Sequence, residues 1–151
     1  MAELKTGDKA PDFTEADQNG NPVSLVDFRG NKLILYFYPK DSTPGCTAEA
    51  CNLRDNYEEL IKKGYKILGV SADSEQSHKN FISKNMLPFP LLADKAKNII
   101  KAYGAWGKKK LYGKEYEGIL RKTFVISETG IIEQIIEKVD TKNHAAQIIP
   151  L

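Results

Sequence analysis

The amino-acid sequence predicts an α/β fold, with a central mixed β-sheet flanked by helices on both faces and preceded by an N-terminal β-hairpin. Three observations lead to this class. Segments with strand and helix patterns alternate along the chain. Two apolar runs, Leu33–Tyr38 and Lys66–Ser71, are typical of strands that are covered on both faces. A hairpin pattern near the C-terminus adds antiparallel strands to this buried pair.

Size and composition predict a single domain over residues 1–151, because 151 residues are too few for two domains of ordinary size. Hydrophobic residues make up 41% and charged residues 28%, which excludes a disordered or fibrous chain. The net charge of +2 is too small to indicate a nucleic-acid partner. Leu33–Tyr38 is far shorter than the ~20 residues of a membrane helix, and Met1–Asp8 contains no apolar signal core. We therefore expect a cytoplasmic protein without a membrane partner.

The first elements follow from turn and strand residues. Asn19-Gly20 suits a two-residue hairpin turn and separates the strand-like segments Phe13–Ala16 and Val23–Leu25. The buried strand Leu33–Tyr38 comes next. It ends at Pro39, because proline has no N–H to donate to a neighbouring strand.

The clearest helix pattern in the sequence follows this strand. Pro44 suits the first helical position, which makes Thr43 the N-cap, and Gly64 ends the helix. Cys46 opens a buried stripe, and Cys51 lies about 140° away on the polar face. The stripe consists of Cys46, Ala50, Leu53, Tyr57 and Leu60.

The rest of the chain is predicted from apolar periodicity and from glycine and proline breakers. The expected elements are a strand over Lys66–Ser71, a helix from Asp73 or Ser74 to about Asn85, a loop over Met86–Pro90, a short helix over Lys97–Tyr103 ended by Gly104, a hairpin of Thr123–Ser127 and Ile131–Val139 around Glu128-Thr129-Gly130, and a helix over Thr141–Ile149. Together these elements give a thioredoxin-like layout.

The two cysteines are expected to act chemically, because two cysteines cannot form a disulfide-rich secreted scaffold. The first turn of a helix presents unpaired N–H groups and the positive end of the helix dipole, which favour the nucleophilic thiolate. The alternative is that Cys46 is only a small buried hydrophobic residue. Its place directly after Thr43-Pro44-Gly45 favours the nucleophile.

The spacing of the two cysteines carries a second inference. In an intact helix their Cα atoms lie roughly 8–9 Å apart, whereas a disulfide needs less than about 7 Å. Either Cys46 and Cys51 never form a bond, or the oxidised protein has a different local structure. The second alternative describes a redox switch with local unfolding.

A family resemblance rests on this segment. Residues 39–46 read Pro39-Lys40-Asp41-Ser42-Thr43-Pro44-Gly45-Cys46 and contain the Pro-x-x-x-Thr-x-x-Cys signature of peroxiredoxins. With Cys51 five residues further on, the chain resembles the subfamily called peroxiredoxin Q or bacterioferritin comigratory protein. The resemblance extends through Gly7–Phe13, Tyr116–Ile119 and Arg121–Ile126.

The resemblance implies a thiol-dependent peroxidase that reduces hydrogen peroxide and organic hydroperoxides without a cofactor or metal. Cys46 is then the peroxidatic cysteine, whose thiolate attacks the O–O bond and becomes a sulfenic acid. Cys51 is the resolving cysteine, which leaves a Cys46–Cys51 disulfide; the alternative for Cys51 is a partly exposed bystander thiol. Thioredoxin or a similar dithiol would reduce the disulfide. Because both cysteines belong to one chain, a monomer is expected.

The resemblance also assigns the residues around the sulfur. The Thr43 hydroxyl would hold the thiolate or the peroxide, and the backbone N–H groups of Gly45 and Cys46 would bind the peroxide oxygen. Pro39 would shield the pocket.

Arg121 is identified through the resemblance as the catalytic arginine, which would favour the thiolate and steer the peroxide. The chain has only two other arginines, Arg29 and Arg54, and residue patterns alone do not choose among the three. The alternative for Arg121 is an ordinary surface ion pair. Glu49, one turn past Cys46, either orients Arg121 or is a solvated helix charge.

Three other features receive ordinary interpretations. His78 and His144 have no cysteine or carboxylate neighbours at metal-ligand spacing, and both are expected to be plain helix residues. Lys108–Lys110 is interpreted as a solvated turn. Trp106 is left unassigned, although a tryptophan in such a position is more often a packing anchor than a binding site.

Two other functions compete with the peroxidase. A general disulfide oxidoreductase of the thioredoxin type carries Cys-x-x-Cys, whereas four residues separate the cysteines here. A non-catalytic redox sensor or holdase would use the same helix unwinding to signal to a partner.

Overall fold

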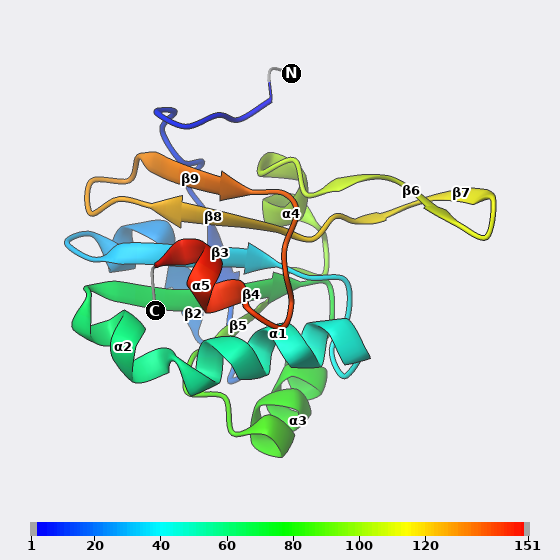
Figure 1. The fold of residues 1–151 in the computed structure, drawn as a ribbon, viewed down its shortest axis with the longest axis horizontal. Coiled ribbons are helices and arrows are strands. Elements are labelled where there is room, and N and C mark those ends of the chain that lie inside the picture. The colour runs from blue at the N-terminus through cyan, green and yellow to red at the C-terminus, as the bar shows by residue number, and fades with distance from the viewer. Residues whose placement is uncertain (1–2, 150–151) are drawn as a thin grey trace.

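The computed structural model describes residues 3–149 (Figure 1). Residues 1–2 and 150–151, the two ends of the predicted domain, lie outside the described residues. A five-stranded mixed sheet forms the centre, in the order β5-β4-β3-β8-β9. The strands are β3 (Lys32–Phe37), β4 (Tyr65–Ser71), β5 (Leu91–Ala93), β8 (Lys122–Ile126) and β9 (Ile132–Ile136). β3, β4 and β5 are parallel to one another, and β8 is antiparallel to both of its neighbours, so the predicted mixed sheet is confirmed.

Helices cover both faces of this sheet (Figure 1). The helices on one face are α1 (Pro44–Asp55), α2 (Tyr57–Lys62), α3 (Glu75–Asn85) and α5 (His144–Ile148). The other face carries α4 (Asn98–Ala102), the 3-10 turn η1 (Leu25–Phe28) and the predicted N-terminal hairpin of β1 (Thr14–Ala16) and β2 (Pro22–Ser24). Within residues 3–149, no helix has the length and apolar character needed to cross a membrane.

The strand β3 and the next residue, Tyr38, supply side chains to two separate cores. Leu33, Leu35 and Phe37 belong to the core under α4, whereas Ile34, Tyr36 and Tyr38 belong to the core under α1. All six are at most 1% exposed, which confirms the prediction of a strand covered on both faces. Cys46 is part of the second core and therefore lies on the α1 face of the sheet.

The single helix expected from Pro44 to Gly64 is instead two helices, α1 and α2, separated at Asn56. The Asn56 side chain donates a hydrogen bond to the carbonyl of Asn52 at 2.9 Å and so competes with the helical backbone pattern. Tyr57 is consequently only half-buried, although the predicted stripe placed it in the core. Gly64 follows α2 with a φ of 88°, as the expected stop.

Three strands were absent from the prediction. β5 lies directly after the Met86–Pro90 loop, and β6 (Trp106–Leu111) and β7 (Lys114–Ile119) form a hairpin that projects from the body (Figure 1). The interpretation of Lys108–Lys110 as a turn is wrong, because these residues lie on β6. The turn itself is Tyr112-Gly113, and both residues adopt positive φ angles.

Smaller differences concern the ends of elements near the C-terminus. The closing helix is α5, which begins at His144 rather than at Thr141, and β9 ends at Ile136 rather than at Val139. Trp106 is half-buried against the core under α4, in agreement with a packing role, and Lys97 Nζ lies 5.1 Å from its ring centre.

Candidate active site

Cys46 lies in the first turn of α1, where the chain leaves the sheet. β3 ends at Phe37, and Pro39 lies half-buried in the connection that follows. Ser42 adopts a left-handed conformation with a φ of 64° and turns the chain, and α1 begins at Pro44. The Cys46 side chain is 1% exposed. The expected position of this cysteine, inward and in the first helical turn, is confirmed.

Thr43 occupies the N-cap position of α1, but its side chain does not cap the helix. Its carbonyl accepts the first helical hydrogen bond, from the N–H of Thr47 at 2.8 Å. Its hydroxyl donates to the carbonyl of Lys40 at 2.9 Å. The hydroxyl oxygen therefore keeps its lone pairs available for a proton donor at the helix N-terminus.

Arg121 connects Cys46 with Glu49. Its Nη2 donates to the Cys46 sulfur at 3.3 Å, and its Nη1 donates to Glu49 Oε1 at 2.7 Å. Gly45 leaves the room for this arrangement, because a Cβ there would lie 3.2 Å from Arg121 Nη2. Burial disfavours the charged guanidinium, but Cys46 and Glu49 outweigh it and raise the pKa of Arg121. A guanidinium in this position stabilises a thiolate at Cys46.

Glu49 is fully buried, so the alternative of a solvated helix charge is wrong. Burial raises the pKa of Glu49 to about 7, and the nearby Arg121 limits this rise. Its second oxygen, Oε2, lies 3.5 Å from His144 Nε2. Glu49 therefore lies between a permanent cation and a buried imidazole.

Cys51 lies in the second half of α1 and is half-buried. Its sulfur contacts Asn85 Oδ1 of α3 at 3.7 Å, so it faces a neighbouring helix rather than open solvent. Both cysteines are free thiols, and α1 runs without a break through both of them. A Cys46–Cys51 bond therefore requires the intervening helical turn to unwind.

Comparison with known proteins decides the family. The sequence model of the AhpC/TSA family matches residues 6–135. The chain belongs to this family. Peroxiredoxin Bcp of Escherichia coli is 45% identical over 144 residues, which are 95% of this chain and 92% of that protein. A putative peroxiredoxin bcp of Coxiella burnetii is 46% identical over 146 residues, which are 97% of each chain.

Solved structures agree with this membership. A peroxiredoxin Q from Xanthomonas campestris has a TM-score of 0.85 and 40% identity and covers 90% of this chain and 87% of its own. A PrxQ from Xylella fastidiosa has a TM-score of 0.91 and 30% identity and covers 98% of this chain and 94% of its own. An X. campestris bacterioferritin comigratory protein, described for its alkyl peroxide reduction activity, has a TM-score of 0.84 and 39% identity and covers 90% of this chain and 87% of its own. The chain is thus a peroxiredoxin of the Q/Bcp type with a thioredoxin-like fold, and its enzyme class is that of the thiol peroxidases.

In this peroxiredoxin, the predicted site residues converge at the N-terminus of α1, with one exception. Thr43, Gly45, Cys46 and Arg121 lie together, and Pro39 lies in the strand-to-helix connection that leads to them. Cys51 is the exception, because it lies on the α3 side of α1.

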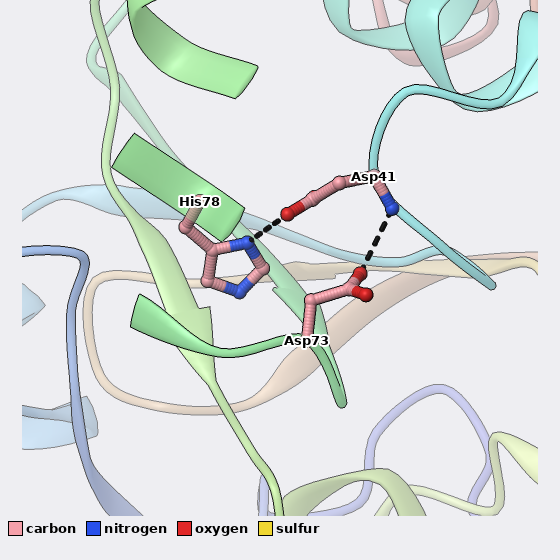
Figure 2. Close-up of side chains that lie close together, drawn as sticks. All are labelled: Asp41, Asp73 and His78. Carbon is pink, nitrogen blue, oxygen red and sulfur yellow. Dashed lines mark hydrogen bonds and ion pairs between the residues drawn. The ribbon is translucent and has the colours of Figure 1, made fainter. Parts of the chain in front are cut away.

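The peroxiredoxin loop before Cys46 is anchored by a polar cluster that the sequence did not reveal. Figure 2 shows Asp41 between His78 and Asp73. The two oxygens of Asp41 accept hydrogen bonds from Tyr38 Oη and from Ser77 Oγ, and one of them lies 2.7 Å from His78 Nδ1. The Asp41 N–H donates to Asp73 at 2.8 Å. The three side chains are close enough to share a cation, but these contacts already occupy Asp41, and we interpret the cluster as an anchor for the loop.

A second cation near the site also escaped the sequence reasoning. Lys109 of β6 donates from Nζ to the carbonyl of Ile119 at 2.9 Å, two residues before Arg121. Burial lowers the pKa of Lys109, and the charge of Arg121 lowers it further. The projecting hairpin thus places a second positive charge close to Arg121 and secures the segment that carries it.

Proposed function

We propose that this peroxiredoxin reduces hydrogen peroxide and organic hydroperoxides, with Cys46 as the peroxidatic cysteine. The observation that carries the proposal is the 3.3 Å contact between Arg121 Nη2 and the Cys46 sulfur at the start of α1. A cation and a helix N-terminus both stabilise a thiolate, and the thiolate is the nucleophile that peroxide cleavage needs. The alkyl peroxide reduction described for the X. campestris relative supports organic hydroperoxides as substrates.

In the first step, the Cys46 thiolate attacks one oxygen of the peroxide. An S–O bond forms, the O–O bond breaks, and the distal oxygen leaves as hydroxide or alkoxide and then takes up a proton. The N–H groups of Gly45 and Cys46 have no partner within the helix and can donate to the peroxide oxygens. The Thr43 hydroxyl accepts from the peroxide O–H, and Arg121 stabilises the charge that leaves with the oxygen. Pro39 limits the access of water.

In the second step, Cys51 attacks the sulfenic acid at Cys46. The S–O bond breaks, a disulfide forms and one water leaves. Because the first turns of α1 must unwind for this bond, the disulfide becomes accessible to an external dithiol. We assign this reduction to thioredoxin or a similar protein, which receives the oxidising equivalents by thiol–disulfide exchange.

A single chain is then sufficient for the whole catalytic cycle. One domain over residues 1–151 carries both cysteines and Arg121, so a monomer suffices for resolution. A supply of reduced dithiol is available in the cytoplasm, where we place the protein.

Peroxide consumption by cysteine variants tests the proposal. Reduced wild type, Cys46→Ser and Cys51→Ser are mixed with peroxide, with and without thioredoxin, its reductase and NADPH. Wild type turns over with thioredoxin, Cys51→Ser reacts once and stops, and Cys46→Ser leaves peroxide at the background level. Full turnover by Cys46→Ser would refute the assignment. A redox sensor would lack multiple turnover with thioredoxin and with other dithiols, and a general oxidoreductase would reduce insulin disulfides without peroxide.

A further inference from the structure

We propose that Glu49, with His144 Nε2 as the neighbouring acceptor, takes up a proton when the Cys46 thiol loses its own and releases it when Cys46 becomes a sulfenic acid. The proposal rests on the proposed role of Cys46 as the peroxidatic thiolate. It makes Glu49 and His144 positioning residues, which set the charge around Arg121 without touching the peroxide.

The hydrogen bonds of His144 fix the tautomer of its ring. Gln147 is oriented by two backbone contacts, since its Nε2 donates to the carbonyl of Lys138 and its Oε1 accepts from the N–H of Asp140. His144 Nδ1 lies 2.8 Å from this same Oε1, which can only accept, so Nδ1 carries a hydrogen. Burial lowers the pKa of His144 and keeps the ring neutral. Nε2 is therefore an acceptor, and the Thr123 hydroxyl donates to it at 2.8 Å.

Glu49 Oε2 lies against this acceptor. Within residues 3–149 it has no hydrogen-bond partner, and it lies 3.5 Å from His144 Nε2. Both side chains are fully buried. A buried carboxylate oxygen with no donor is unfavourable, and the neighbouring Nε2 has no hydrogen to give it. A proton on Oε2 removes the unpaired negative charge, and it can share the Nε2 lone pair with the Thr123 hydroxyl.

The charges around Glu49 couple this proton to Cys46. The titratable groups that face Glu49 are Arg121, His144 of α5, Cys46 of its own helix and Tyr36 of β3. Lys109 adds a charge beyond Arg121. Of the side chains in the described part of the chain that contact Glu49, Arg121 alone is permanently charged. When Cys46 is a neutral thiol, a Glu49 carboxylate balances the guanidinium. When Cys46 is a thiolate, a second buried anion is costly, and Glu49 becomes the neutral acid.

The proton balance of the reaction then closes. The Cys46 thiol and the Glu49 carboxylate become a thiolate and a carboxylic acid, with no net exchange of protons with solvent. The thiolate gives an electron pair to the peroxide oxygen, and the alkoxide leaves. The sulfenic acid at Cys46 is neutral, so Arg121 again needs an anion and Glu49 gives up its proton. Glu49 thus releases one proton, and the alkoxide takes up one proton when it becomes an alcohol.

Infrared difference spectroscopy on reduced Cys51→Ser at pH 7, before and after one equivalent of hydrogen peroxide, tests the coupling. We expect a carboxylic acid C=O band in the reduced protein that disappears as the sulfenic acid forms. Glu49→Gln lacks the band, which assigns it to Glu49. An unchanged band, or none in the reduced protein, would overturn the proposal. Peroxide consumption in the same sample reports the proposed function separately, so a sample that forms the sulfenic acid without a band change contradicts only the proton coupling.

The role of His144 is tested by His144→Leu with Thr123→Val as the matched variant. His144→Leu removes the acceptor for the Glu49 proton, and the band disappears at a lower pH than in the parent. The rate constant of Cys46 oxidation at pH 7 falls about fivefold, as expected for one lost buried hydrogen bond. Thr123→Val removes the other partner of the same nitrogen and keeps the band. Equal effects of both variants on the band and on the rate constant, or no effect of either, would contradict the role of His144. If His144→Leu does not fold, the Glu49→Gln spectra still test the coupling of Glu49 to Cys46.

Discussion

At the scale of single residues, Arg121 determines the charge at the active site. One guanidinium nitrogen contacts the Cys46 sulfur and another contacts Glu49, so the same cation serves two groups that become anionic. Gly45 permits this approach because it has no Cβ. A single side chain therefore joins the nucleophile, the helix N-terminus and the buried acid.

Replacement of Arg121 by Met should slow the oxidation of Cys46 by peroxide about a hundredfold. The reason is that a preorganised donor to a developing anion contributes a factor of about 10² to 10³. Stopped-flow peroxide consumption by the reduced protein measures the rate constant. Arg29→Met is the control, because Arg29 is exposed and its guanidinium lies beside Gly130, in the turn before β9. An equal rate in Arg121→Met and Arg29→Met would show that Arg121 has no catalytic role.

At the scale of elements, the two steps of the proposed reaction require different conformations of α1. Its intact first turn presents Cys46 to the peroxide, but the Cys46–Cys51 bond needs that turn to open. The far end of the helix is held to the C-terminal segment, since the Asn52 side chain accepts from the N–H of Ala145 and donates to the carbonyl of Lys142. We expect the unwinding to stop at Asn52.

Amide hydrogen exchange measures the extent of this unwinding. Oxidation of wild type should accelerate exchange over residues 43–52 and leave the end of α1 protected. In Cys51→Ser the same oxidant leaves exchange unchanged, because no disulfide forms. Full protection of residues 43–52 in the oxidised wild type would be incompatible with a Cys46–Cys51 bond.

A weaker helix between the cysteines should speed the second step. Ala48→Gly costs about 1 kcal/mol of helix stability, which favours the unwound form and accelerates disulfide formation up to about fivefold. The loss of free thiols after one equivalent of peroxide measures this rate. Ala102→Gly in α4, on the opposite face of the sheet, serves as the control. If Ala48→Gly formed the disulfide no faster than the control, unwinding would not limit resolution.

At the scale of the whole molecule, the sequence predicts local elements better than it predicts contacts between distant segments. The buried strands β3 and β4, the start of α1 and the position of Cys46 depend on short residue patterns, and these were predicted correctly. The β6–β7 hairpin was missed because its turn, Tyr112-Gly113, lacks the usual Asn or Asp before the glycine.

Contacts between distant segments could not be predicted, because residue periodicity does not say which segments meet in space. Glu49 and Arg121 are 72 residues apart, and Asp41 and His78 are 37 apart. The contact of Arg121 with Cys46 was anticipated only through the family resemblance. No local pattern marked His144 as a neighbour of Glu49.

The free energy of unfolding of the whole domain should depend on pH because Glu49 is buried. Its folded pKa of about 7 lies above the ordinary value of 4.5, so the unfolded chain loses this proton first as the pH rises. The free energy of unfolding should therefore fall between about pH 4.5 and 7, by about 3 kcal/mol for this group. Glu49→Gln should lack this decrease.

Urea denaturation at pH 5 and pH 7 measures the difference, with the exposed Glu58→Gln on α2 as the control. We expect Glu58→Gln to follow the wild type and Glu49→Gln to show a smaller change with pH. Parallel curves for all three proteins would mean that Glu49 titrates as an ordinary surface carboxyl.

The central claim, that the Cys46 sulfur attacks the peroxide, is tested most directly by locating the transferred oxygen. Reduced Cys51→Ser is treated with one equivalent of hydrogen peroxide, trapped with a sulfenic acid reagent and analysed by peptide mass spectrometry. The account predicts one adduct per chain, on Cys46. An unmodified Cys46 after the peroxide has been consumed, or an adduct on another residue, would contradict it.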